Sequence, residues 1–578
     1  MGKRSKEARR APAGRPAEGA AGPRPPSHGW LFAALLLAAA IAYLPALSGP
    51  FLFDDRGLER FLSAPAPLSV LLQRLARVVA TLSHLAEARL FGPSPAVFHA
   101  SNILLHLLNG VLVWRILETL LARRGPLRAM DRFAAAAGAG LFLLHPIATE
   151  AVAYISSRPE LLCVFFSYSA FFVFLRSGEG QAMGPGRAIA VMLLLGLGVL
   201  SKEPAVAMVG VFAVFDLLDG ERLALKPLLD RWKLYVPLLA GGAAVALRLY
   251  RTLSREGSAG VSSKNAPLDY LLTQFEVIWQ YFRLILAPAG QNLDHAYPVT
   301  KAPGGVWTWL GLAALGALVL AGWRMRRRYP LALFGLLFLL ILLAPTSSIV
   351  PIDDAMAERR LYLGFAGVSM IAAEFLRRLR PSPAVYGAAG AVLLILATLT
   401  WRRAELFTAA IPMWEDSVAA NPRNSRAWFH LGFAYYEAGR CGDAVRAYER
   451  AAATDSTRDY TLLVDWGLAL ECAGRLDEAE ARLKEAMTLE PDSTGKAVFG
   501  RVLAKKGQLD RAIEVLNEAV GMNPADANAL VYRGNARLLR GEAAEALADY
   551  EAALRIQPQD AAALKGRQSA LRALGGKP

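Results

Sequence analysis

Long apolar runs alternate with short charged loops between residues 30 and 401. Residues 1–28 are polar and basic, and residues 411–578 have the composition of a water-soluble protein. A helix that crosses a bilayer needs roughly 20 apolar residues, so the middle section predicts a polytopic bundle of about eleven membrane spans. The predicted spans, with approximate ends, are 30–48, 99–122, 133–150, 160–176, one on each side of 201–204, 234–249, 306–323, 331–345, 361–376 and 383–400.

The C-terminal part repeats with a period of about 34 residues. Small residues at fixed offsets let paired helices approach closely, which indicates tetratricopeptide repeats and hence a soluble α-solenoid. We expect a half repeat at 404–422 and a capping helix at 561–575. The repeated positions are Gly432, Gly467, Gly500 and Gly534, then Gly439, Gly474, Gly507 and Gly541, then Ala444, Ala479, Ala512 and Ala546, and finally Ala451, Ala486, Ala519 and Ala553.

Basic residues set the expected orientation. The formal net charge is +15, but the cations cluster between apolar runs, as in cytoplasmic loops, rather than forming a nucleic-acid surface. A span at 270–287 would put the basic cluster at 324–328 outside, so we expect a partly buried or interfacial helix there. The all-α chain then divides into a cytoplasmic tail (1–28), a transmembrane domain (29–403) and an outer repeat domain (404–578).

Familiar catalytic and metal motifs are absent. The three cysteines, Cys163, Cys441 and Cys472, have no CxxC or zinc spacing, so the sequence supports neither a disulfide framework nor a metal knuckle. No Walker, HExxH or GxSxG motif occurs. The candidate functional residues are therefore polar side chains in or beside the spans, which are costly in a bilayer.

Asp54 and Asp55 directly follow the first span, where a carboxylate can act as a general base toward a hydroxyl. The plain alternative is a solvated acidic loop. His99, Asn102 and His106 share one helical face, and their alternative is a set of interhelical hydrogen bonds. Lys202 and Glu203 lie between two short spans, and their alternative is a structural ion pair. The other candidates are His145, Glu150 and Arg158, and Glu358, Arg359 and Arg360.

The predicted topology places six of these residues at the outer membrane face: Asp54, His99, His145, Arg158, Lys202 and Arg359. Acids, histidines and cations that converge on one side indicate a site there, and cations suit a phosphate ligand because they neutralise and orient it. Since no nucleotide signature occurs, a lipid is the expected phosphate carrier.

The combined motifs resemble the transmembrane and tetratricopeptide-repeat O-mannosyltransferases over nearly the whole chain. They are Phe53-Asp54-Asp55, Phe98-His99-x-x-Asn102-x-x-x-His106, His145-Pro146-x-x-x-Glu150, Arg158-Pro159-Glu160, Leu200-Ser201-Lys202-Glu203 and Glu358-Arg359-Arg360-Leu361-Tyr362. The resemblance implies a GT-C-like catalytic domain at 29–403, a polyprenyl-phosphate sugar donor, and catalysis by the acids of the first outer loop, here Asp54 and Asp55. The family's usual Arg-Pro-Leu sequence is missing between residues 68 and 91.

We therefore expect an inverting glycosyltransferase that moves a mannose-like sugar from a polyprenyl-phosphate donor to a protein or glycan hydroxyl. Asp54 and Asp55 are the expected catalytic residues, and two carboxylates are too few to claim a metal, although a divalent cation is possible. Arg158, Lys202, Arg359 and Arg360 are the expected phosphate ligands, supported by His99, Asn102, His106, His145, Glu150, Glu203 and Glu358.

Two other functions fit parts of the pattern. A non-enzymatic scaffold would use the repeats to recruit envelope partners, and a polysaccharide ligase or flippase would act on surface polymers. A transporter, however, should carry charges near the middle of the membrane.

The expected partners are membrane lipid and proteins bound by the repeats, without nucleic acid. Because no Asn-x-Ser/Thr sequence occurs, a bacterial inner membrane with periplasmic repeats is favoured over the endoplasmic reticulum.

Overall fold

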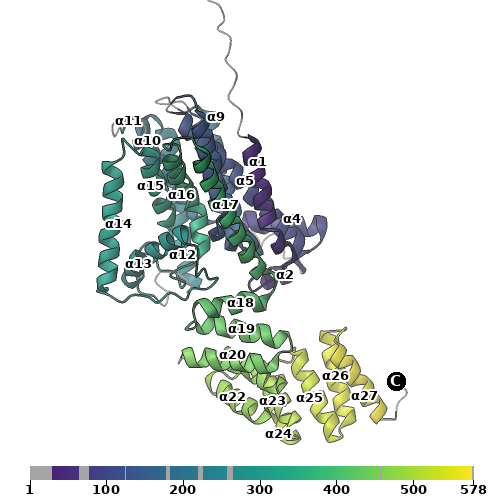
Figure 1. Ribbon diagram of the computed structural model, residues 1–578. Coiled ribbons are helices and arrows are strands. Elements are labelled where there is room, and N and C mark those ends of the chain that lie inside the picture. The colour runs from purple at the N-terminus through teal and green to yellow at the C-terminus, as the bar shows by residue number, and fades with distance from the viewer. Residues whose placement is uncertain are drawn as a thin grey trace, which may run out of the picture.

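The computed structural model describes residues 29–63, 77–123, 125–177, 183–218, 225–256, 265–455 and 459–575, so the predicted tail at 1–28 lies outside the described residues. Every regular element in these ranges is a helix, as expected. Figure 1 shows a bundle of long helices with an array of short paired helices below its lower end.

Each of the eleven predicted apolar segments contains a helix, and buried side chains from all of them except 306–323 contribute to one large core. Aromatic rings fill its centre, where Phe171 packs against Phe212 and Phe338 at centroid distances of 6.0 and 5.9 Å. The bundle helices are α1 (Gly29–Ala42), α5 (Pro95–Ala122), α6 (Ala129–Leu144), α8 (Arg158–Leu175), α9 (Pro185–Ser201), α10 (Met208–Leu218), α12 (Trp232–Glu256), α14 (Val306–Arg324), α15 (Pro330–Leu343), α16 (Leu361–Leu376) and α17 (Pro383–Glu405).

Among the described residues, five helical segments are long and apolar enough to cross a membrane alone, and six if the bent pair Ala129–Leu144 and Pro146–Ala153 is one span. The helices α9 and α15 are apolar but shorter, so the count of eleven spans stays a prediction. The five long segments are Gly29–Ser48, Pro95–Ala122, Ile155–Leu175, Val306–Arg324 and Pro383–Thr408.

Basic clusters meet at one end of the bundle. Where α6 begins and α16 ends, Asp131 pairs with Arg128 (2.9 Å) and Arg377 (3.4 Å), and Arg378 contacts the backbone of Arg328, so clusters assigned to the cytoplasm lie together. At the other end, the lower one in Figure 1, further helices lie beside the repeats. These helices are α2 (Asp55–Ser63), α4 (Val78–Phe91) and α13 (Pro267–Leu286), the last covering the segment expected at the membrane interface.

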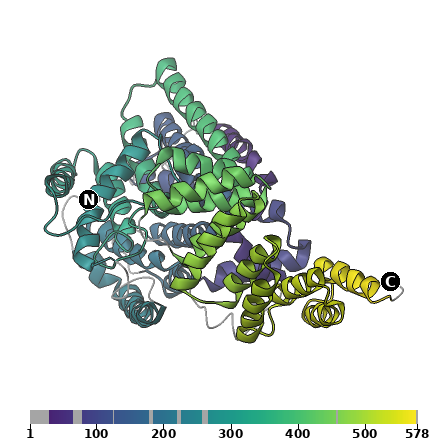
Figure 2. The ribbon, with the colours of Figure 1, turned by 90° about the horizontal axis from the view of Figure 1, so that it is seen from below.

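The repeat domain follows α17 through η7 (Leu406–Thr408), and Arg403 pairs with Asp416 across this connection at 2.8 Å. Seen from below in Figure 2, the repeats run from beneath the bundle out to one side, with the C-terminal helix farthest out. The repeat helices are α18 (Ala410–Ala420), α19 (Ser425–Glu437), α20 (Cys441–Thr454), α21 (Tyr460–Cys472), α22 (Leu476–Leu489), α23 (Ser493–Lys505), α24 (Leu509–Met522), α25 (Ala527–Arg540), α26 (Ala543–Ile556) and α27 (Ala561–Ala573).

The repeated glycines have two different physical roles. A Cβ atom on Gly500 would lie 2.5 Å from Leu516 Cγ of the paired helix, so that position permits close helix packing. Gly541, by contrast, ends α25 with φ of +93°, a left-handed conformation that glycine adopts without steric cost. The small residues therefore give both the helix contacts and the turns of the solenoid.

A disulfide joins Cys441 to Cys472, whereas Cys163 is buried and free. The Cα atoms of the bonded pair are 5.7 Å apart, inside the usual range for disulfides. The sequence-based expectation of no disulfide was wrong, because only the stacking of neighbouring repeats brings the start of α20 next to the end of α21.

Candidate active site

The two acids at the start of α2 have different surroundings. Asp55 is buried, and its carboxylate accepts hydrogen bonds from the backbone N–H groups of Ser156 (2.7 Å) and Leu52 (3.2 Å) and from the Ser156 hydroxyl. Burial raises the pKa of Asp55 to about 6, against the lowering effect of these bonds. Asp54 is exposed, and its backbone N–H donates to the Tyr154 hydroxyl at 2.9 Å. Asp55 thus anchors the loop and leaves Asp54 as its accessible carboxylate.

Two carboxylates and two cations meet where four bundle segments end. Glu150 and Glu160 are buried, while the side chains of Arg359 and Lys202 stay 31% and 19% exposed. Arg359 Nη1 lies 2.5 Å from Glu150 Oε1, and its Nε lies 3.7 Å from Glu160 Oε1. Lys202 pairs with Glu160 rather than with the adjacent Glu203, which is half-buried. We call Glu150, Glu160, Lys202 and Arg359 the ion cluster.

The ion cluster lies near the acid pair. Burial raises the pKa of the Tyr154 hydroxyl, and the charges of Asp55, Asp54 and Arg359 also act on it. Tyr154 follows α7 (Thr149–Ala153), the short helix that carries Glu150. This part of the chain therefore connects the exposed acid to the cations.

The Arg158 side chain is enclosed by protein on all sides. Its guanidinium is fully buried, pairs with Glu87 at 2.8 Å, and donates to the Phe98 carbonyl at 3.0 Å and to Asn102 Oδ1 at 2.9 Å. Asn102 in turn donates toward the carbonyl of Tyr154 at 3.3 Å. The structure thus places this predicted phosphate ligand as a link between α8, α5 and α4.

The three predicted histidines are buried within the bundle. Because His106 Nε2 lies 3.0 Å from the Leu143 carbonyl and donates to it, its Nδ1 accepts from the Tyr362 hydroxyl at 2.8 Å. His145 Nδ1 accepts from the Ile147 N–H at 3.1 Å. His145 Nε2 contacts the Ile285 carbonyl at 3.0 Å, and His99 packs beside Gly49. His106 and His145 thus make the interhelical and capping bonds of the plainer interpretation.

Glu358 is the centre of a polar network that sequence analysis missed. It accepts hydrogen bonds from the Asn292 N–H (2.6 Å), the Gln291 amide (2.8 Å) and His295 Nε2 (2.9 Å). Although burial acts to raise it, these bonds, led by that from His295, hold the pKa of Glu358 below its usual value. The segment 291–295 reads as an ordinary polar loop, so no local signal marks it.

Arg360 binds the backbone of the loop that precedes it. Its guanidinium donates to the backbone carbonyls of Asp354 at 2.6 Å and Ala355 at 3.2 Å. Both acceptors are neutral, so they orient the side chain without cancelling its charge. Arg359 and Arg360 therefore project from one short helix, η6 (Glu358–Arg360), with different partners.

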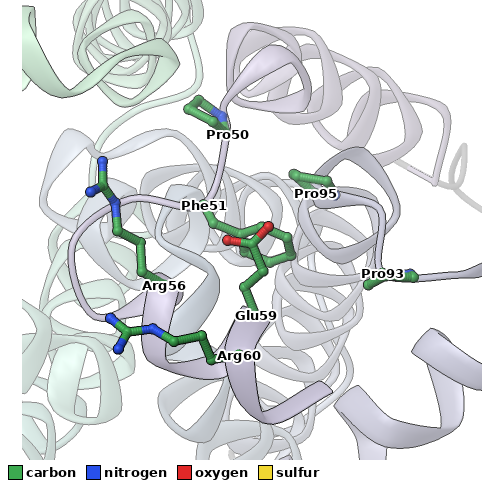
Figure 3. A pocket seen from close by; sticks show the side chains of 7 residues that line it. All are labelled: Pro50, Phe51, Arg56, Glu59, Arg60, Pro93 and Pro95. Carbon is green, nitrogen blue, oxygen red and sulfur yellow. The ribbon is translucent and has the colours of Figure 1, made fainter. Parts of the chain in front are cut away.

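A pocket with a volume of about 500 Å³ opens beside the acid pair. Figure 3 shows Arg56 and Arg60 on one side, Pro93 and Pro95 on the other, and Phe51 between them. Pro50 and Glu59 complete its lining. Phe51 and Arg56 flank the acid pair in the chain, although neither acid lines the pocket itself.

Metal ligands do not gather at this site. Within the part of the chain that the structure describes, no three His, Cys, Asp or Glu side chains are arranged to hold a metal ion.

The fold and the site define a membrane protein whose polar end is covered by a repeat domain. The family described as tetratricopeptide repeat matches residues 402–460 and 498–561. Protein O-mannosyl-transferase F38B6.6 of Caenorhabditis elegans is 25% identical over 457 residues, which are 73% of this chain and 62% of the relative. Protein O-mannosyl-transferase TMTC3 of Mus musculus is 21% identical over 567 residues, covering 87% and 58%. For TMTC1 of Homo sapiens the identity is 25%, covering 63% and 46%.

The chain is therefore a relative of the transmembrane and tetratricopeptide-repeat O-mannosyltransferases, as the motifs predicted. It spans about half the length of these curated relatives. Among solved structures, the repeat protein YrrB is 20% identical, with a TM-score of 0.25, over 32% of this chain and 89% of that chain.

We predict that Arg158→Met lowers the free energy of unfolding by ~3–5 kcal/mol, because it leaves the Glu87 carboxylate without its buried partner. Thermal unfolding of the detergent-solubilised full-length protein measures this. Arg89→Met changes an exposed arginine of the same helix as Glu87 and should stay within about 0.5 kcal/mol of wild type. If the Arg158→Met protein has wild-type stability but fails to bind donor, Arg158 is a donor ligand, as the sequence predicted.

Proposed function

We propose that the protein is a membrane glycosyltransferase that moves a mannose-like sugar from a polyprenyl-phosphate donor to a hydroxyl of a protein or glycan acceptor. The observation that carries this proposal is that Tyr154 lies within the influence of both the exposed Asp54 and Arg359, one of the two partly exposed cations of the ion cluster. A base next to phosphate-binding cations suits transfer from a sugar phosphate. The similarity to O-mannosyltransferases supports the identity of the sugar.

In the proposed site, Lys202 and Arg359 bind the donor phosphate and Arg360 adds positive charge nearby. The buried carboxylates of Glu160 and Glu150 hold the first two cations in place. Negative charge grows on the phosphate as its bond to the anomeric carbon breaks. Cations that are already positioned therefore stabilise the transition state more than the ground state.

On the acceptor side, Asp54 takes the proton from the acceptor hydroxyl as its oxygen attacks the anomeric carbon. A hydroxyl is a weak nucleophile at neutral pH, and a positioned carboxylate compensates for this. The adjoining pocket offers the acceptor a route to Asp54. A single displacement with one base inverts the anomeric configuration, and the phosphate leaves on its lipid.

We place this site on the outer side of the membrane, the periplasmic side if the host is bacterial. Two independent observations support that orientation. The basic clusters gather at the opposite end of the bundle, as cytoplasmic loops do. The Cys441–Cys472 disulfide lies in the repeats, and disulfides persist in oxidising compartments such as the periplasm.

This orientation predicts how the thiols react. After denaturation without reductant, one thiol per chain, Cys163, should react with a maleimide, and all three should react after reduction. In a Cys472→Ala variant, a membrane-impermeant maleimide should label Cys441 from the outer side of intact cells or spheroplasts. Labelling only after the membrane is opened would place the repeats, and with them the site, in the cytoplasm.

Replacing the base should stop transfer without removing the donor. Asp54→Asn should reduce turnover by about 10²–10⁴-fold and leave donor binding and stability near wild type, because Asp54 is exposed. The product linkage made by the wild type should have the configuration opposite to that of the donor. Asp477→Asn, at a 92% exposed carboxylate of the repeats, is the control. Full activity of Asp54→Asn, or a retained configuration, would contradict this mechanism.

Removing one donor cation should weaken catalysis. Lys202→Met should lower turnover roughly 10²–10³-fold, since one positioned electrostatic contact to the developing charge is lost. Lys301→Met removes a 73% exposed lysine that pairs with Asp269 and should leave turnover unchanged. If a folded Lys202→Met protein turns over like wild type, Lys202 is only the structural partner of Glu160.

A further inference from the structure

The first complete repeat consists of α19 and α20. One of its arginines forms ion pairs with acids in two loops of the bundle. Arg426 Nε and Nη2 lie 2.5 and 2.6 Å from the two carboxylate oxygens of Asp294. The same Nη2 lies 2.7 Å from Asp354 Oδ1. A planar guanidinium can make such a bidentate bond and still reach a second acid, which an ammonium cannot reproduce.

Both of these loops form hydrogen bonds with the short helix that carries the proposed donor cations. The Asp294 loop contributes Asn292 and His295 to the buried carboxylate of Glu358, the residue before Arg359. The backbone carbonyl of Asp354 accepts from Arg360 Nη2 at 2.6 Å. A shift of either loop must therefore move one end of η6, from which both cations project.

The same repeat, together with Trp414 of the preceding helix α18, also contacts the acid loop. Phe53 has a φ of 47°, a left-handed conformation that persists in a non-glycine residue only where its surroundings enforce it. Its ring packs edge-on against His430 and Trp414, at centroid distances of 4.6 and 5.5 Å. Arg56 pairs with Glu437 through two bonds, of 2.5 and 2.7 Å. The residues on both sides of the acid pair are thus attached to the repeats.

We propose that the first repeat completes the transfer site, with Arg426 as the positioning residue for the donor cations Arg359 and Arg360. This inference rests on the proposed function and adds a specific coupling to it. The repeats act on the reaction through the geometry of η6. Loss of the Arg426 ion pairs should therefore weaken donor use more than acceptor use, since the Phe53 and Arg56 contacts to the repeats remain.

The test uses the full-length protein with polyprenyl-phosphate mannose as donor. Arg426→Ala should raise the KM for the donor by roughly 10–100-fold, the cost of misplacing a binding group. The KM for the acceptor should change less than about twofold. Hydrogen exchange of residues 353–360 should become faster. Arg446→Ala, which removes an exposed arginine paired with Asp443 on α20, should change none of these quantities.

Arg426→Lys keeps the charge and most of the volume, so it tests the same proposal if Arg426→Ala does not fold. It should show the same donor-specific loss in smaller degree. Equal changes in both KM values, or unchanged exchange at 353–360, would overturn the proposal. Lack of transfer by the wild-type protein would instead refute the proposed function, and the exchange measurement would still decide whether Arg426 orders this segment.

Discussion

Buried carboxylates at the lower end of the bundle set the arrangement of everything around them. Glu150, Glu160 and Glu358 are all removed from water, and a buried charge is tolerated only when it is paired and hydrogen-bonded. Glu150 and Glu160 pair with Arg359 and Lys202, whereas Glu358 accepts hydrogen bonds from three donors of one loop. The segments that supply these partners are far apart in sequence, so satisfying the acids forces them together.

Breaks in the helices make this end of the bundle polar. At His145-Pro146 the chain leaves α6, and the His145 ring accepts from the Ile147 N–H that proline-induced unwinding would otherwise leave unpaired. At Lys202 the chain leaves α9 in an extended conformation, which directs the lysine toward Glu160. Interrupted helices therefore expose backbone and charged groups where an unbroken span would present only apolar side chains, and irregular backbone at such depth needs protein partners.

Apolar periodicity sufficed to predict the helices, and fixed small residues sufficed to predict the repeats, since both are local signals. Contacts between residues that are far apart in the sequence have no such local signal. The disulfide, the Arg426–Asp294 contact and the hydrogen bond between His106 and Tyr362 each join segments whose spacing has no local meaning. Arg158 shows the same limit: its position beside a conspicuous motif predicted a ligand contact, but the arrangement of α4 and α5 encloses it. Asp54 and Asp55 are adjacent in sequence, and only the position of Ser156 distinguishes the buried acid from the exposed one.

The charge balance of the ion cluster bears on how the proposed reaction would gain its rate. Two carboxylates and two cations make it formally neutral, which costs less in a low dielectric than two unpaired cations would. In the proposed mechanism, a donor phosphate would share the N–H groups of Lys202 and Arg359 with Glu160 and Glu150, and the donor would be held weakly before reaction. As charge builds on the leaving phosphate, the same cations would shift their interaction toward it. Acids that compete with the donor would thus restrict strong binding to the transition state, where it accelerates the reaction.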